Sequence, residues 1–149
     1  MLSVCRIGLR RRQVDTYNMF RPVNKIGVIG ENIAVMFLMK QGFSIIGRNF
    51  WKKWGEIDII AKKGDKTYFV EVKSVSCENI SDIDLKQGTG YRPEDNLHKN
   101  KLARLCRTIA TYCEEKNVDG EWQIDAIIVY VDEKQKKSKV KVISNIIIE

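Results

Sequence analysis

The chain of 149 residues has little of what membrane-spanning proteins and zinc proteins need. No apolar run approaches the ~20 residues with which a helix crosses a bilayer, so no membrane-spanning helix is expected. The four cysteines include no Cys-x-x-Cys pair, and His98 is the only histidine, so no group of residues has the spacing of a zinc site. We expect reduced thiols with a structural role and a cytoplasmic location.

An excess of acidic residues is also lacking. The formal net charge is +7, which invites a nucleic-acid partner. Most of this excess belongs to the first 25 residues, which hold six basic residues and one acidic residue. The rest of the chain carries a net charge of only +2. Net charge is therefore weak evidence about the folded part of the chain.

Residues 1–22 are rich in arginine, poor in acids and without hydrophobic periodicity. This composition predicts a flexible basic N-terminal arm. The alternatives are an organelle-targeting peptide, a translation start at Met19 and a DNA-binding arm. Residues 23–149 have the length of one globular domain, and the 44% apolar and 30% charged composition is typical of soluble proteins.

Hydrophobic periodicity predicts two helices and five strands. We expect helices over 24–41 and from Asp95 or Asn96 to about 116, and strands over 43–48, 57–61, 68–72, 122–131 and 140–148. Residues 74–93 follow no period and predict a long loop. The order α-β-β-β-α-β-β predicts an α/β fold, in which helices flank a mixed sheet in three layers or fewer.

A hairpin at the centre of the chain carries charges in strands that otherwise read as buried. Its apolar arms flank Gly64-Asp65, a sequence typical of a tight turn whose first residue has a positive φ. Asp58 interrupts the first arm, and Glu71 and Lys73 interrupt or follow the second. A lone buried charge costs several kcal/mol unless it is paired or bound to a metal, so these three residues require an explanation.

Pairing of the two arms can bring these charges to one point on the sheet. Residues two apart face the same side of a strand, so Glu71 and Lys73 project together, and Asp58 can approach them from the other arm. Two neighbouring carboxylates repel each other unless one is protonated or a hard cation neutralises both. Oxygen ligands favour Mg²⁺ or Mn²⁺ over zinc. A nearby ammonium can orient a water or stabilise charge on a phosphate.

The first helix adds one more carboxylate. Glu31 shares the inward-facing stripe with Ala34, Val35 and Leu38, which is an unusual place for an acid. The alternative to a catalytic role is an ion pair at the edge of the helix. Lys73 likewise has a structural alternative, because it could neutralise Glu71 or Asp58 in a salt bridge at the end of the strand.

Two further features allow contact with nucleic acid. Lys99, Lys101 and Arg104 lie on the exposed side of the second helix and could contact phosphates, although such a run is ordinarily a solvated helix face. Trp51 and Trp54 enclose two lysines. Aromatic residues among lysines can stack on bases, but two tryptophans beside a strand more often cover the core, and we favour the core interpretation.

These motifs, taken in order, resemble those of a bacterial family called YraN or UPF0102. The matching residues are Gly30-Glu31, Gly42, Arg48-Asn49, Gly55-Glu56-Ile57-Asp58, Phe69-Val70-Glu71-Val72-Lys73, Lys101, Leu105 and Ile124-Asp125. The resemblance spans nearly all of residues 25–131. The family is in turn similar to the PD-(D/E)xK superfamily of restriction-endonuclease-like nucleases, and in its Glu, Asp, Glu-x-Lys order it looks like archaeal Holliday junction resolvases.

The resemblance implies roles for individual residues. Asp58 and Glu71 would hold the metal, Lys73 would serve the attacking water, and Glu31 would complete the site from the helix. Lys101 would occupy a basic position near the substrate. Asp125 matches a family motif and can also simply brace its strand. The chain departs from the family at position 75, where valine replaces a frequent arginine, and in a longer segment over 76–93; both departures concern substrate choice.

The leading hypothesis is therefore a restriction-endonuclease-like, Mg²⁺- or Mn²⁺-dependent endonuclease that acts on DNA, with branched or otherwise structured DNA as the expected substrate. A non-catalytic nucleic-acid-binding module with the same fold is the alternative. A third hypothesis is a protein-interaction domain in which the charges are structural. The analogy with resolvases, which cut symmetric strands, implies a homodimer, and no residue specifies it.

Overall fold

The computed structural model describes residues 24–84 and 99–146. The predicted arm, the predicted caps at Asp95 or Asn96 and residues 85–93 of the predicted loop lie outside the described residues. The described elements are α1 (Lys25–Lys40), β1 (Ser44–Lys52), β2 (Gly55–Lys63), β3 (Lys66–Ser76), the short 3₁₀ helix η2 (Ile80–Asp82), α2 (Lys99–Lys116), β4 (Trp122–Asp132) and β5 (Lys137–Ile143).

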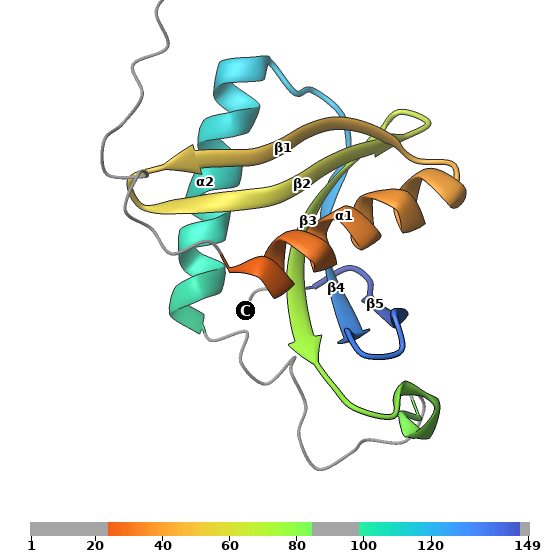
Figure 1. The fold of residues 1–149 in the computed structure, drawn as a ribbon. Helices are drawn as coiled ribbons and strands as arrows, with labels where there is room; N and C mark the ends of the chain where they lie inside the picture. The colour runs from red at the N-terminus through yellow and green to blue at the C-terminus, as the bar shows by residue number, and fades with distance from the viewer. Residues whose placement is uncertain (1–23, 85–98, 147–149) are drawn as a thin grey trace, which may run out of the picture.

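The five strands form one sheet in the order β1-β2-β3-β4-β5. Three of the four neighbouring pairs are antiparallel, and only β3 and β4 run parallel, which requires the crossover that α2 provides. The sheet is strongly twisted, with α1 on one side and α2 on the other (Figure 1). The predicted α/β class, the element order and the mixed sheet flanked by helices are confirmed, in three layers.

Each face of the sheet has its own apolar core. Under α1, Leu38 packs with a group of buried strand residues that includes Ile59 and Val70. Under α2, Leu105 packs with a second group that includes Ile57 and Phe69. Because both faces are covered, the central strands are apolar on both sides, which explains why their sequences read as nearly continuous hydrophobic runs.

Helix α1 lies unusually close to the sheet at one point. A Cβ atom added to the buried Gly30 would come within 1.8 Å of the Ser74 side-chain oxygen, so only glycine permits this approach of the helix to β3. The helix begins as predicted, since the Asn24 side chain accepts a hydrogen bond from the backbone N–H of Gly27 at 3.1 Å. It is followed by Gly42, which has a φ of +88°.

Three predicted boundaries are wrong. The last strand spans Lys137–Ile143 instead of 140–148, because Asn145, with a φ of +56°, departs from extended backbone. The first strand continues to Lys52 instead of ending at 48, because its pairing with β2 extends to the turn. The predicted loop over 74–93 is wrong at 74–76, where β3 pairs with β4 as far as Ser76 and Val131, and at 80–82, where η2 forms. The parallel ladder supplies backbone partners to residues whose side chains show no pattern, so periodicity could not detect this part of the strand.

In the described ranges, no helix has both the length and the apolar character needed to cross a membrane. The three described cysteines, Cys77, Cys106 and Cys113, are unpaired. Burial raises the pKa of each of these thiols above its ordinary value, which keeps them protonated at neutral pH and fits the predicted structural role.

Candidate active site

The site lies where β2 and β3 separate. Their antiparallel pairing runs from Lys63 and Lys66 at the turn to Ile59 and Val70, and no further pair follows. Beyond this point the Asp58 carboxylate accepts a hydrogen bond from the backbone N–H of Val72 at 2.7 Å. The Asp58 side chain thus provides the hydrogen-bond acceptor for a β3 amide at the point where the pairing with β2 ends.

An irregularity in β1 and β2 accompanies the position of Asp58. Ile57 and Ile59 are two residues apart, yet they pack into the cores on opposite faces of the sheet. Asn49 lies opposite Asp58, because its neighbours Arg48 and Phe50 pair with these two isoleucines, and Asn49 has a left-handed backbone with a φ of +50°. Asparagine tolerates this conformation better than most residues. Because Ile57 and Ile59 face opposite sides, Asp58 between them has an orientation that regular alternation does not provide.

The environment of Asp58 opposes its ionisation. Its side chain is buried, and this burial, together with the charge of Glu71 and smaller contributions from Glu56 and Glu31, raises its pKa from 3.8 to about 8. The hydrogen bond from Val72 acts in the opposite direction but only partly offsets these effects. The structure therefore brings at least two of the predicted carboxylates, Asp58 and Glu71, close enough to interact strongly.

Glu71 is buried too, but it has a counter-ion. Lys101, which reaches the site from α2 and is itself half-exposed, forms an ion pair with the Glu71 carboxylate. Lys73 follows Glu71 on the same face of β3 and is partly buried, but no hydrogen bond or ion pair joins it to another described residue. The salt bridge that the sequence allowed for Lys73 is thus made by Lys101 instead.

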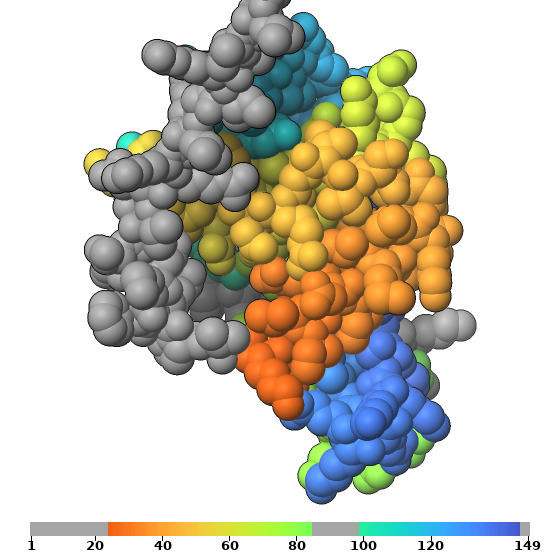
Figure 2. All heavy atoms as spheres, turned by 45° about the horizontal axis from the view of Figure 1, so that its top comes forward, coloured from red at the N-terminus to blue at the C-terminus, as the bar shows by residue number. Residues whose placement is uncertain are grey.

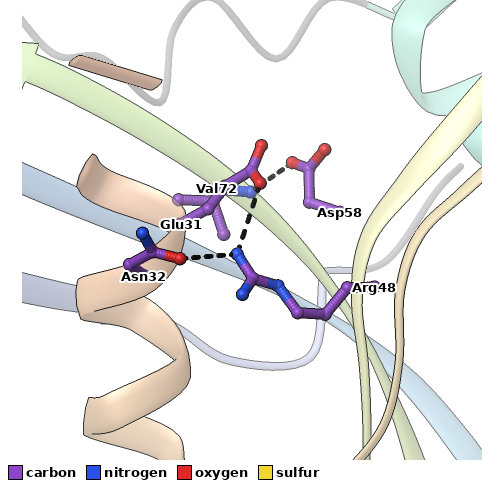
Figure 3. Close-up of polar contacts among 5 residues, drawn as sticks. All are labelled: Glu31, Asn32, Arg48, Asp58 and Val72. Carbon is purple, nitrogen blue, oxygen red and sulfur yellow. Dashed lines mark hydrogen bonds and ion pairs between the residues drawn. The ribbon is translucent and has the colours of Figure 1, made fainter. Parts of the chain in front are cut away.

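Glu31 approaches the site from α1 and is held by β1. Its carboxylate lies 3.7 Å from the Arg48 guanidinium, which also donates a hydrogen bond to the Asn32 side chain at 2.9 Å. In Figure 3 the carboxylates of Glu31 and Asp58 lie near each other, and the Arg48 guanidinium lies below both. The ion pair that the sequence allowed as the alternative for Glu31 is therefore present. Arg48 was not singled out from the sequence, although it belongs to the Arg48-Asn49 motif.

The donor set suits a hard divalent cation. Two carboxylates that repel each other in a buried place are stabilised by a shared positive ion, and their ligand atoms are all oxygens. Within 24–84 and 99–146, no three side chains of the His, Cys, Asp or Glu type are gathered into a ready-made metal cage. Mg²⁺ does not need one, since it is commonly held by one or two carboxylates and retains several waters.

A surface cavity of about 490 Å³ adjoins the site at Glu71. Its wall comes from the β1–β2 turn, β3 and α2, and it includes Trp51, Lys52, Lys53, Trp54, Gly55, Glu56, Glu71, Lys101, Arg104 and Leu105. Of the basic residues predicted to contact nucleic acid, Lys101 and Arg104 thus lie on the cavity wall, and Lys99 is exposed in the first turn of α2. The core interpretation is wrong for Trp51, which is 41% exposed.

Asp125 has a bracing role. Its carboxylate accepts hydrogen bonds from the Gln123 side chain at 2.7 Å and from the backbone N–H of Asn145 at 2.9 Å. The backbone N–H of Ile146 also donates to the carbonyl of Ile124. These contacts fasten the segment after β5 to the start of β4, so the family motif at this position serves the fold.

Comparison with known proteins gives a consistent result. The model of the uncharacterised protein family UPF0102 matches residues 30–129, which include all the carboxylates of the site. A UPF0102 protein of Campylobacter fetus is 38% identical over 120 residues, which cover 80% of this chain and 91% of the relative. UPF0102 proteins of Campylobacter hominis (37% identical, 82% of this chain, 93% of the relative) and Wolinella succinogenes (36%, 69% and 83%) are also similar.

Proposed function

The chain belongs to the UPF0102 family, and because that family's description assigns no activity, we propose from the site itself that this protein is a Mg²⁺- or Mn²⁺-dependent endonuclease that hydrolyses phosphodiester bonds in DNA. The observation that carries the proposal is the buried pair of Asp58 and Glu71 at the opening between β2 and β3, beside a cavity with basic walls. The resemblance of the Glu31, Asp58, Glu71-x-Lys73 order to PD-(D/E)xK nucleases and archaeal resolvases supports it.

The chain's own residues divide the work as follows. Asp58 and Glu71 would hold the cation, which would supply Lewis-acid stabilisation of charge growing on the phosphate. Lys73, whose ammonium has no partner among the described residues, would orient the attacking water. The water oxygen forms a bond to phosphorus and loses a proton, while the ester oxygen leaves on the opposite side and gains one. Lys101 would be released from Glu71 to contact a phosphate.

Cleavage assays test the proposal directly. Fluorescent linear, flap and four-way-junction DNA are incubated with the protein and Mg²⁺ or Mn²⁺. Asp58→Ala and Lys73→Ala are each expected to slow cleavage by about 10²-fold or more, because each removes charge stabilisation at the reacting phosphate. Matched controls are Asp65→Ala and Lys62→Ala, which change exposed residues of the same type on the same hairpin. If no DNA is cut, or if the variants and controls cut equally, the enzymatic proposal fails.

One observation favours a second candidate, a non-catalytic nucleic-acid-binding module. Lys101 already neutralises Glu71, so the protein folds with a counter-ion at a position where a metal would bind. This candidate predicts DNA binding that weakens with salt, needs no divalent cation and survives Asp58→Ala. Calorimetric titration with Mn²⁺ separates the two, since the enzyme should show a site that Asp58→Ala removes and the binding module should show none.

A further inference from the structure

A second cavity extends the first one along α2. It measures about 500 Å³ and is lined by Lys53, Trp54, Ala103, Arg104 and Arg107. Three of these residues, Lys53, Trp54 and Arg104, also line the cavity that contains Glu71, so the two hollows adjoin. We call the combined surface the tryptophan groove. It runs from the carboxylate site to the exposed side of α2.

The floor of the tryptophan groove is tightly built. A Cβ atom on Gly55 would come within 2.8 Å of the Thr108 hydroxyl and 3.3 Å of the Arg104 carbonyl, so glycine lets the β1–β2 turn rest directly on the helix. The Arg107 guanidinium stacks over the Trp54 ring at 4.3 Å from its centre. These contacts hold the turn and its aromatic residues in place without a ligand.

Trp51 is the exposed aromatic residue of the groove. An indole that is 41% exposed contributes less to the core than a buried one, and its apolar surface remains in contact with water. Phe50, its neighbour in β1, packs inward against Tyr112 with ring centres 5.0 Å apart. The alternation along the strand therefore directs Trp51 to the face opposite Phe50, away from the core under α2. Trp51 forms part of the wall of the cavity that Glu71 also lines.

The cations of the groove differ in their availability. Lys52 is engaged, because it forms an ion pair with Glu115 and lies 5.2 Å from the Phe50 ring centre. Lys53 and the guanidinium of Arg104 are exposed and make no ion pair or hydrogen bond with the described part of the chain. Unpaired cations spaced along a groove are a general means of binding a phosphate backbone.

We propose that the tryptophan groove binds a single-stranded segment of DNA, with an unpaired base stacked on Trp51 and phosphates held by Lys53 and Arg104. An indole can stack only on a base whose face is free, and in a duplex those faces are covered by neighbouring bases. The groove leads to Glu71, so the inference rests on the proposed function for its biological meaning: the substrate would be DNA with unpaired bases near the bond that is cut.

Binding measured in EDTA tests the inference apart from catalysis. Fluorescence anisotropy compares a labelled oligothymidylate with a duplex of equal length, and the single strand is expected to bind about 10-fold more tightly. Trp51→Ala is expected to weaken single-strand binding by about 10-fold or more, because stacking on one aromatic residue contributes this much. The matched control is Trp122→Ala, which changes a tryptophan of similar exposure outside the groove, and melting curves verify that both variants fold.

Charge and site variants complete the test. Arg104→Gln should weaken binding to all strands and lower the slope of log K against log salt by about one, as expected for one lost phosphate contact. Asp58→Asn should bind the single strand like the wild type, so loss of cleavage and loss of strand binding are distinguishable. Tighter binding of the duplex, of RNA or of a polyglutamate peptide than of the DNA strand, or an unchanged affinity in Trp51→Ala, overturns the inference.

Discussion

The two halves of the β2–β3 pair differ in the hydrogen-bond partners of their backbone and in the residues that pack against them. Near the turn, residues 59–63 and 66–70 form a regular ladder, and every inward-facing position is apolar or a small hydroxyl. Beyond Ile59 the ladder stops, a carboxylate caps an amide, and α1 lies against β3 through Gly30. The first half is stabilised as an ordinary hairpin. The second half holds the buried carboxyl groups, and there a side chain replaces strand pairing as the partner of the backbone.

The largest expected effect is a difference in the free energy of unfolding between substitutions in the two halves. Phe69 and Lys73 lie on the same face of β3, one in each half, and Phe69 is fully buried. Phe69→Ala should lower the free energy of unfolding by about 3–5 kcal/mol through lost burial and a cavity. Lys73→Ala should change it by less than about 0.5 kcal/mol. Urea denaturation measures both values; similar losses would mean that Lys73 has a structural role and the halves do not differ.

A smaller effect tests the contact that closes the separated half. In Gly30→Ala the new methyl group would overlap the Ser74 side chain, and we expect a loss of about 1–3 kcal/mol from overpacking, beyond any gain in helix propensity. Adding Ser74→Gly removes the overlapping atoms and should restore part of the loss. Thermal melts of the two single variants and the double variant give the coupling; purely additive effects would disprove the contact.

A third prediction concerns the slope of stability against pH. Because the folded state raises the pKa of Asp58 to about 8, it binds a proton more tightly than the unfolded chain does, so stability contributed by this group declines as pH rises from about 4 to about 8. The slope is at most about 1.4 kcal/mol per pH unit. Asp58→Asn cannot ionise and should show a flatter profile. Denaturation without divalent cations at a series of pH values compares them, and parallel profiles would contradict the assignment.

Much of the fold followed from local patterns in the sequence. The hairpin turn has the positive φ that its Gly64 predicted, Asn24 caps α1, and the element order is as expected. The interaction of Asp58 with Glu71 was also foreseen, because charges in apolar strands need each other or an ion. These features depend on residues that are close in sequence or on a single pairing of strands, and both can be predicted from the pattern of residue types.

The remaining features of the site depend on irregularity and on helix placement. Regular alternation would put Ile57 and Ile59 on one face. The left-handed backbone of Asn49 in the facing strand accompanies the change, and hydrophobic periodicity does not reveal it. The ion pair between Lys101 and Glu71 requires the rotation and position of α2, which its hydrophobic stripe does not define to one residue. Trp51 contradicted a statistical expectation, since its neighbour Phe50 fills the core position.

The single parallel pair in the sheet has a consequence for how the protein folds. Strands β1, β2 and β3 are joined by short turns and can pair soon after they meet, whereas Glu71 and Ala126 become neighbours only after a long intervening segment has closed. The groove needs the helix within that segment. We therefore expect the meander to form early and the site to be completed late, so that a partly synthesised or partly refolded chain has a sheet before it has a working surface.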